Sequence, residues 1–136
     1  MADAAAHGAG GSAFPAAAWF RQLVRFVESD ADFRQHGRWL TARIAIRVDQ
    51  ELVVMTFDRG LILDVSSDLA DHDVLIAGRR DDWNHLFEQG WGLVRLYRSG
   101  TLQLRGDAVW VMRNWKALFF VVDAMRRLGV APATPV

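Results

Sequence analysis

The spacing of hydrophobic positions along the chain changes several times, and each change predicts a new secondary-structure element. Over residues 15–28 the apolar side chains recur every three or four positions, which is typical of an amphipathic helix. Asp30 is placed to cap a second, short helix over 31–36. Over 38–48 apolar and polar positions alternate, which predicts a half-buried strand.

Two further strands are predicted at 52–57 and 61–66, each reached through a short turn. Asp49-Gln50 forms the first turn. Asp58-Arg59-Gly60 forms the second, because glycine supplies the positive φ that tight hairpins require. Three strands joined by such short turns form an antiparallel meander.

The second half of the chain alternates short strands with helices. A fourth strand is predicted over 74–77, and Asp81 or Asp82 then caps the start of a helix. A helical turn over 92–99 and a strand over 101–105 follow. The order is two helices, four strands, two helices, one strand and a last helix. This order predicts an α+β domain with one largely antiparallel sheet.

The last helix, predicted over about 108–128 with Asp107 as its N-cap, is apolar around most of its circumference. Such a helix must be covered on more than one side. The sheet covers one side, and a second layer, a partner chain or a ligand is needed for the other.

The composition supports a single packed domain. The chain has 136 residues, 51% of them hydrophobic, and a chain of this length normally forms one domain. We expect a flexible Ala/Gly-rich tail over 1–13, the domain over 14–129 and a C-terminal tail over 130–136. Six Trp and eight Phe stand against one Tyr, and indoles suit either a core or the wall of an apolar cavity.

Charge and cysteine content exclude several classes of protein. The chain has no cysteine, which excludes disulfides, thiolate metal sites and a cysteine nucleophile. Sixteen basic and sixteen acidic residues cancel, which argues against binding to nucleic acid. We interpret the excess of arginine and alanine as the base composition of a bacterial genome.

The sequence also predicts where the protein resides. No apolar run is long enough for a transmembrane helix. Residues 1–12 lack the basic and apolar regions of a secretory signal. We therefore expect a cytoplasmic protein.

Three segments, taken in order, resemble the sterol carrier protein 2 domain, the SCP2-like family. The first is the strand-turn-strand around Asp58-Arg59-Gly60, which continues as Leu61-Ile62-Leu63-Asp64-Val65. The second is Asp73-Val74-Leu75-Ile76. The third is Ser99-Gly100-Thr101-Leu102-Gln103-Leu104-Arg105-Gly106-Asp107, which leads directly into the closing helix. The resemblance covers about residues 17–128.

This resemblance implies a five-stranded, largely antiparallel sheet with helices packed on one face. It also implies an apolar cavity between the sheet and the C-terminal helix that accepts lipids, fatty acyl groups or sterols, in a carrier without catalytic residues or a cofactor. The chain departs from the family in Trp83, Trp91, Trp110 and Trp115, which are bulky enough to narrow or fill such a cavity. It ends in Pro-Ala-Thr-Pro-Val rather than in a peroxisomal address, so the peroxisomal role of eukaryotic relatives does not carry over.

We therefore expect a hydrophobic small-molecule ligand between the sheet and the closing helix. The predicted ligand-binding residues are Val109, Met112, Trp115 and Phe119 for one wall, Phe87 and Trp91 for the mouth, and Leu104 for the floor. In the alternative interpretation, the outer apolar stripe of the same helix docks a second copy of the chain, as a homodimer, or a partner enzyme.

Two other patterns have simpler explanations. The acidic segment 68–73 is too compact in sequence to enclose a metal ion and is typical of a solvated loop. His85 with Asp81 or Asp82 has the spacing of a general base and its orienting carboxylate, but this spacing is ordinary for a helix. No Gly-x-Ser-x-Gly nucleophile motif is present. We expect no metal site and no catalytic residue.

Overall fold

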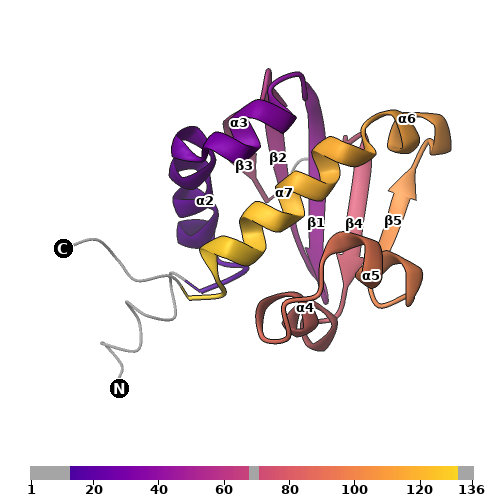
Figure 1. Ribbon diagram of the computed structural model, residues 1–136. Helices are drawn as coiled ribbons and strands as arrows, with labels where there is room; N and C mark the ends of the chain where they lie inside the picture. The colour runs from indigo at the N-terminus through magenta and orange to yellow at the C-terminus, as the bar shows by residue number, and fades with distance from the viewer. Residues whose placement is uncertain (1–12, 68–70, 132–136) are drawn as a thin grey trace.

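Helices cover one face of a five-stranded sheet in the computed structural model, which describes residues 13–67 and 71–131 (Figure 1). The helices are α2 (Ala17–Ser29), α3 (Ala31–Gly37), α4 (Arg80–Phe87), α5 (Leu93–Arg98), α6 (Ala108–Arg113) and α7 (Trp115–Leu128). The strands are β1 (Ala42–Val48), β2 (Glu51–Asp58), β3 (Leu61–Ser66), β4 (Val74–Gly78) and β5 (Gln103–Gly106). Of the predicted tails, residues 1–12 and 132–136 lie outside the described residues.

The strands run in the order β3-β2-β1-β4-β5; the pair β1–β4 is parallel and the other described pairs are antiparallel. In β1 the side chains of Ile44, Ile46 and Val48 are buried in the main core. Arg43 and Arg47 alternate with them and are exposed on the other face. The period of two therefore decides which face the helices cover. The predicted α+β class and largely antiparallel sheet are confirmed.

The turn between β2 and β3 is a two-residue loop, Arg59-Gly60, in the segment where the sequence predicted a tight turn. Both residues have a positive φ, 51° at Arg59 and 82° at Gly60, as in the primed turns that suit hairpins. The Gly60 N–H donates to the Leu40 carbonyl (2.9 Å), and the Arg59 N–H donates to the Thr41 hydroxyl (3.0 Å). A Cβ on Gly60 would lie 2.8 Å from the Gly37 carbonyl oxygen, so this close approach requires glycine.

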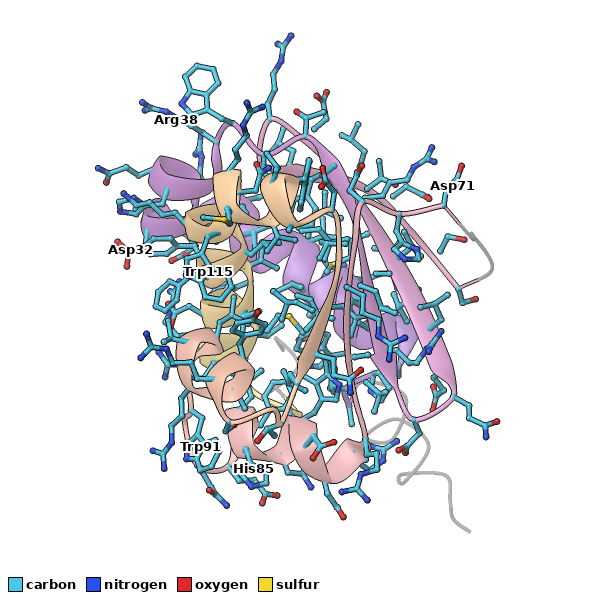
Figure 2. The ribbon with its side chains drawn as sticks, turned by 90° about the vertical axis from the view of Figure 1, so that its right-hand side faces the viewer. Asp32, Arg38, Asp71, His85, Trp91 and Trp115 are labelled. Carbon is cyan, nitrogen blue, oxygen red and sulfur yellow. The ribbon has the colours of Figure 1, made fainter. Side chains whose placement is uncertain are left out.

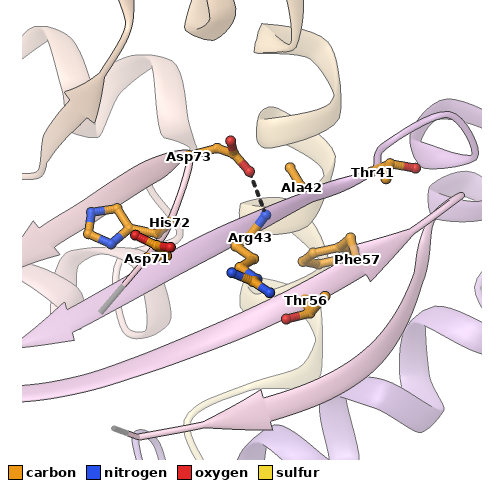
Figure 3. A pocket seen from close by; sticks show the side chains of 8 residues that line it. All are labelled: Thr41, Ala42, Arg43, Thr56, Phe57, Asp71, His72 and Asp73. Atoms are coloured by element: carbon orange, nitrogen blue, oxygen red, sulfur yellow. Dashed lines mark hydrogen bonds between the residues drawn. The ribbon is translucent and has the colours of Figure 1, made fainter. Parts of the chain in front are cut away.

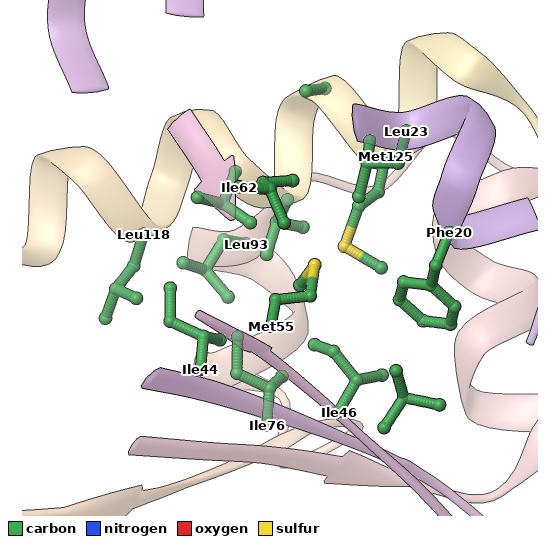
Figure 4. Packing of buried hydrophobic residues seen from close by; sticks show 14 of the residues in the cluster. Phe20, Leu23, Ile44, Ile46, Met55, Ile62, Ile76, Leu93, Leu118 and Met125 are labelled. Atoms are coloured by element: carbon green, nitrogen blue, oxygen red, sulfur yellow. The ribbon is translucent and has the colours of Figure 1, made fainter. Parts of the chain in front are cut away.

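Helix α7 crosses the middle of the sheet, with α2 and α3 on one side of it and α4 and α5 on the other (Figure 1). Leu118, Val121 and Met125 of α7 are buried in one cluster with Ile44 and Met55 of the sheet (Figure 4). Complete burial of each such side chain contributes roughly 1.5–3 kcal/mol. This cluster therefore joins the helical layer to the central strands.

Neighbouring helices cover part of the rest of α7. The Phe120 ring is half-buried and stacks on the His36 ring of α3, with centroids 4.2 Å apart and an interplanar angle of 8°. The Phe119 ring is also half-buried and meets Phe120 edge to face at 5.3 Å. Some of the cover that the apolar closing helix needs is therefore provided by its own domain.

The closing helix is broken, which corrects the prediction of one continuous helix over about 108–128. The break is at Asn114 (φ −106°, ψ 12°) and separates α6 from α7. The Asn114 amide donates from Nδ2 to the Trp110 carbonyl (2.9 Å). Asparagine competes with helical backbone bonding in this way, a local effect that hydrophobic spacing does not reveal.

Two predicted boundaries also move. Strand β1 begins at Ala42 rather than at residue 38, and Trp39 is left 78% exposed before it. The N-cap of α4 is Arg79 rather than Asp81 or Asp82. Asp82 acts from the third helical position, where its carboxylate accepts a hydrogen bond from the Arg79 N–H (2.9 Å).

An ion pair fixes the end of α7 to the junction of α2 and α3. The Arg127 guanidinium donates to both carboxylate oxygens of Asp30 (2.8 and 2.6 Å) and to Asp123 (2.9 Å). Asp30 also accepts from the Phe33 N–H (3.1 Å), which confirms it as the cap of α3. The hydrogen bond from Arg127 lowers the pKa of the Asp30 carboxyl.

Replacing Asp30 by asparagine tests this ion pair. Because the pKa of Asp30 is lower in the folded than in the unfolded chain, its stabilisation is present above the unfolded value, about 3.9, and is lost as pH falls through the folded value. We expect Asp30→Asn to lower the free energy of unfolding at neutral pH by about 1–2 kcal/mol, and the difference from wild type to shrink in acid. Urea titrations across this pH range measure both effects. The exposed Asp32 provides the control, and an equal loss in Asp32→Asn would contradict the assignment.

The β2–β3 turn gives a second prediction, with a control in the same chain. Gly60 and Gly100 have similar positive φ, 82° and 77°, but a Cβ on Gly100 meets nothing within 4 Å. We expect Gly100→Ala to cost about 1 kcal/mol of stability and Gly60→Ala at least about 2 kcal/mol, because only the latter adds a backbone clash. Thermal or urea unfolding of the two variants measures the difference. Equal losses would show that the contact with Gly37 does not matter.

Candidate functional site

An apolar groove opens to solvent where α5 meets the broken closing helix. Its volume is about 560 Å³. We call it the α5–α7 groove, and its lining residues are Val94, Tyr97, Arg98, Val111, Met112 and Trp115. Five of these six side chains are apolar or aromatic, a composition typical of small-molecule sites.

Two aromatic rings form the centre of the α5–α7 groove. Tyr97 of α5 and Trp115 of α7 meet edge to face, with centroids 5.6 Å apart. Met112 of α6 is 78% exposed beside them, and Tyr97 is 50% exposed. Figure 2 shows Trp115 on the helical side of the molecule, midway between its two ends. Exposed apolar side chains grouped in this way commonly mark a binding surface.

A second groove adjoins the first along α5. It is lined by Gly92, Val94, Arg95, Arg98, Ser99 and Phe119 and has a volume of about 630 Å³. Val94 and Arg98 line both grooves, so the two are continuous along α5. A Cβ on Gly92 would lie 3.9 Å from the Phe119 ring, within van der Waals contact. The Gly92 backbone therefore forms a floor next to that ring.

Three of the predicted ligand-binding residues line these grooves. Met112 and Trp115 line the α5–α7 groove, and Phe119 lines the second groove. Trp91 precedes α5 and lies between two cationic or aromatic neighbours: the Arg95 guanidinium is 3.8 Å from its ring centroid, and the His85 ring is 4.6 Å away. Trp91 does not line the second groove itself. It directly precedes Gly92, which does, and its ring is held by Arg95 and His85.

The structure does not bring the other predicted residues to the same place. Phe87 packs against the rings of Phe14 and Trp19, at 5.0 and 6.0 Å. Leu104 on β5 is half-buried against the main core, and Val109 on α6 is 59% exposed. These three residues line neither groove. The residues predicted for the floor (Leu104), part of the mouth (Phe87) and part of the wall (Val109) therefore do not join Met112, Trp115 and Phe119 at the grooves.

Sequence reasoning missed the contribution of α5. Val94, Tyr97 and Arg98 line the α5–α7 groove, whereas Leu93 and Leu96 of the same helix are buried. The helical spacing of Leu93 and Leu96 was sufficient to place Val94 and Arg98 on the opposite face. A helix of six residues, however, has too few positions to establish from spacing alone which of its faces is buried.

The acidic segment near β4 forms part of a separate, polar pocket (Figure 3). The lining residues are Thr41, Ala42, Arg43, Thr56, Phe57, Asp71, His72 and Asp73. The Asp73 carboxylate accepts a hydrogen bond from the Arg43 N–H, and the Asp73 N–H donates to the Arg43 carbonyl, each at 2.8 Å. Asp73 therefore extends the pairing of β1 with β4 beyond the strand ends. Residues 68–70 of the predicted loop lie outside the described residues.

The groups considered for catalysis or metal binding do not assemble in the described part of the chain. No cluster of three or more His, Asp or Glu side chains able to hold a metal occurs there. His85 Nδ1 lies 3.0 Å from the Asp81 carbonyl oxygen, not from a carboxylate. The Asp82 carboxylate is bonded to the Arg79 N–H. His85 is therefore not paired with the carboxylate of Asp81 or Asp82, in line with the interpretation of this spacing as ordinary helix geometry.

Within residues 13–67 and 71–131, every helix is too short or too polar to cross a bilayer.

The fold matches solved structures of sterol carrier proteins. A crystal structure of sterol carrier protein 2 matches with a TM-score of 0.69 at 16% identity, covering 80% of this chain and 94% of that one. A conserved hypothetical protein from Thermus thermophilus, described as possibly a sterol carrier protein, gives 0.67 at 18% identity, covering 88% and 92%. The UbiJ-SCP2 ubiquinone synthesis protein gives 0.58 at 19% identity, covering 82% and 90%. At these identities the likeness shows the fold.

The family follows from the sequence match. The model of the SCP-2 sterol transfer family matches residues 21–119, most of the chain. The chain therefore belongs to the SCP-2 sterol transfer family, which confirms the resemblance that its strand and turn motifs suggested. No curated protein sequence matches the chain.

Proposed function

We propose that this chain is a non-catalytic carrier that binds a hydrophobic small molecule, a fatty acyl or sterol-like lipid, in the α5–α7 groove. Membership of the SCP-2 sterol transfer family supports the class of ligand. The observation that carries the proposal is the pairing of Tyr97 and Trp115 in an open groove of about 560 Å³, next to the exposed Met112.

The size of the groove suits binding without a charged contact. Pockets for small ligands have volumes of roughly 300–1,000 Å³. A ligand that buries about 300 Å² of apolar surface gains on the order of 7 kcal/mol before the cost of association. Aromatic walls add to this, because flat rings offer a large contact area with little loss of conformational freedom.

Two arginine side chains, Arg95 and Arg98, would orient the polar end of the ligand. Arg98 lines both grooves and Arg95 lines the second one. Neither forms an ion pair with a carboxylate in the described residues. A fatty acid would place its chain along Tyr97 and Trp115 and its carboxylate near these guanidinium groups, where charge-assisted hydrogen bonds are strong.

The proposed position differs from the one expected from sequence. That expectation placed the ligand between the sheet and the closing helix. The sheet-facing side chains of α7, among them Leu118 and Met125, pack in the core with Ile44 and Met55. We therefore place the ligand on the side of α7 that faces α5. Met112 and Trp115 are retained from the predicted wall, and Phe119 lines the adjoining second groove.

Removing the indole of Trp115 tests the site. We expect Trp115→Ala to raise the Kd for a fluorescent fatty acid such as cis-parinaric acid about tenfold, because about 1.4 kcal/mol of ring contact is lost. Met112→Asp should weaken binding similarly, and Met112 is so exposed that this change leaves the core intact. Trp39→Ala is the matched control, because Trp39 is exposed and lines neither groove. Wild-type protein that binds no lipid, or equal losses in all three variants, would contradict the proposal.

The alternative function is docking of a second copy or a partner enzyme through the outer side of α6. Val109 and Met112 favour it, because they are 59% and 78% exposed on this short helix. We expect sedimentation velocity to show a monomer, since a carrier needs its groove free. A tight dimer that Val109→Asp dissociates would instead favour docking, and lipid should then compete with dimerisation.

A further inference from the structure

The methionines of the described chain lie in two different environments. Met55 of β2 and Met125 of α7 are fully buried in the main core. Met112 of α6 is 78% exposed. Met1 lies outside the described residues. Within residues 13–67 and 71–131, Met112 is therefore the methionine whose side chain a reagent dissolved in water reaches.

The local backbone holds Met112 in the wall of the α5–α7 groove. Helix α6 ends at Asn114, whose backbone N–H donates to the Trp110 carbonyl (3.0 Å), as its side-chain amide also does. Met112 thus lies on a short, anchored helix and lines the groove beside the paired rings of Tyr97 and Trp115. A chemical change at its sulfur therefore alters the apolar wall that the proposed ligand contacts.

The thioether of methionine is oxidised to a sulfoxide by peroxides. A sulfur lone pair attacks one oxygen of hydrogen peroxide, and the S–O bond forms as the O–O bond breaks. The leaving hydroxide takes the proton of the transferred hydroxyl and departs as water, so the sulfur is oxidised and the peroxide is reduced. The chain has no cysteine, whose thiolate would compete for the peroxide.

A sulfoxide at Met112 changes the groove in two ways. Its S=O group is polar, so a lipid chain that covers it removes it from water without providing a hydrogen bond, which is unfavourable. Its oxygen also accepts hydrogen bonds. Arg98 lines the same groove and forms no ion pair with a described carboxylate, so its guanidinium has donors for that oxygen. Both effects lower the affinity for lipid.

We propose that Met112 is a reversible oxidation site through which peroxide lowers the affinity of the α5–α7 groove for its lipid. This inference rests on the proposed function, because the groove must bind lipid for oxidation to release it. The core is not affected, since Met55 and Met125 are buried and Met112 lies outside the core cluster. Methionine sulfoxide reductases restore the thioether and with it the binding, which distinguishes a switch from damage.

Peptide mapping by mass spectrometry tests the modification site. In dilute hydrogen peroxide we expect Met112 to gain one oxygen atom at least about tenfold faster than Met55 or Met125 does. These two buried methionines are matched controls within the same molecule. Because Met112 lies outside the core, the thermal unfolding midpoint of the oxidised protein should equal that of the untreated protein. Oxidation of all three methionines at one rate would overturn the proposal.

Binding of cis-parinaric acid tests the consequence for the groove. We expect selective oxidation of Met112 to raise the Kd about tenfold, and treatment with methionine sulfoxide reductases A and B to restore it. Met112→Gln, which replaces the thioether by a polar group, should bind about as weakly as the oxidised wild type.

Two variants control for oxidation at other positions. Met112→Leu offers no sulfur, so its own Kd should be the same before and after peroxide treatment. Trp39→Ala removes an exposed indole that does not line the groove, and it should respond to peroxide as the wild type does. An equal rise of the Kd in peroxide-treated Met112→Leu would place the sensitive group elsewhere and overturn the proposal.

The binding measurements also separate this inference from the proposed function. Untreated protein that binds no cis-parinaric acid would refute the proposed function and the switch with it. Untreated protein that binds the fatty acid, but whose Kd does not change when Met112 is oxidised, would refute the switch alone.

Discussion

The burial of one side of α7 against the central strands is the contact on which the rest of the molecule depends. The sheet has helices over one of its faces only, so Ile44 and Met55 have α7 and its neighbours as their cover. Once α7 is seated, Arg127 reaches Asp30, and the Trp19 indole N–H reaches the Gly129 carbonyl at 2.7 Å. These polar contacts fix the helix ends, but their net contribution is small beside that of the buried apolar surface.

Most of the fold could be predicted from the sequence because its signals are local. Alternation in β1, the Arg59-Gly60 turn and the capping role of Asp30 each depend on a few neighbouring residues, and the structure has all three. The break at Asn114 could not be predicted in the same way. The apolar pattern continues across it, and the event that ends α6 is a bond from one amide side chain to the Trp110 carbonyl.

The candidate site was predictable only in part, because a site depends on which helices become neighbours. Spacing placed Met112, Trp115 and Phe119 on the closing helix, and they line grooves in the structure. It could not show that α5 provides the opposite wall, nor that Phe87 turns instead toward Phe14. Spacing also could not show that Arg34, Arg38 and Arg59 line one groove, since they come from the α3 region and a hairpin that meet only after folding.

Strand β1 is the centre of the sheet in space but is an edge strand while the chain is being synthesised. Its antiparallel partner β2 follows at once, whereas its parallel partner β4 begins only at Val74 and the helix that covers it only at Trp115. A nascent chain on the ribosome therefore presents an unpaired edge of β1 until β4 emerges, and the apolar side chains of β1 that α7 covers stay exposed until α7 emerges. The order of elements makes the packing of the central strand depend on the synthesis of a helix that lies almost seventy residues further along the chain.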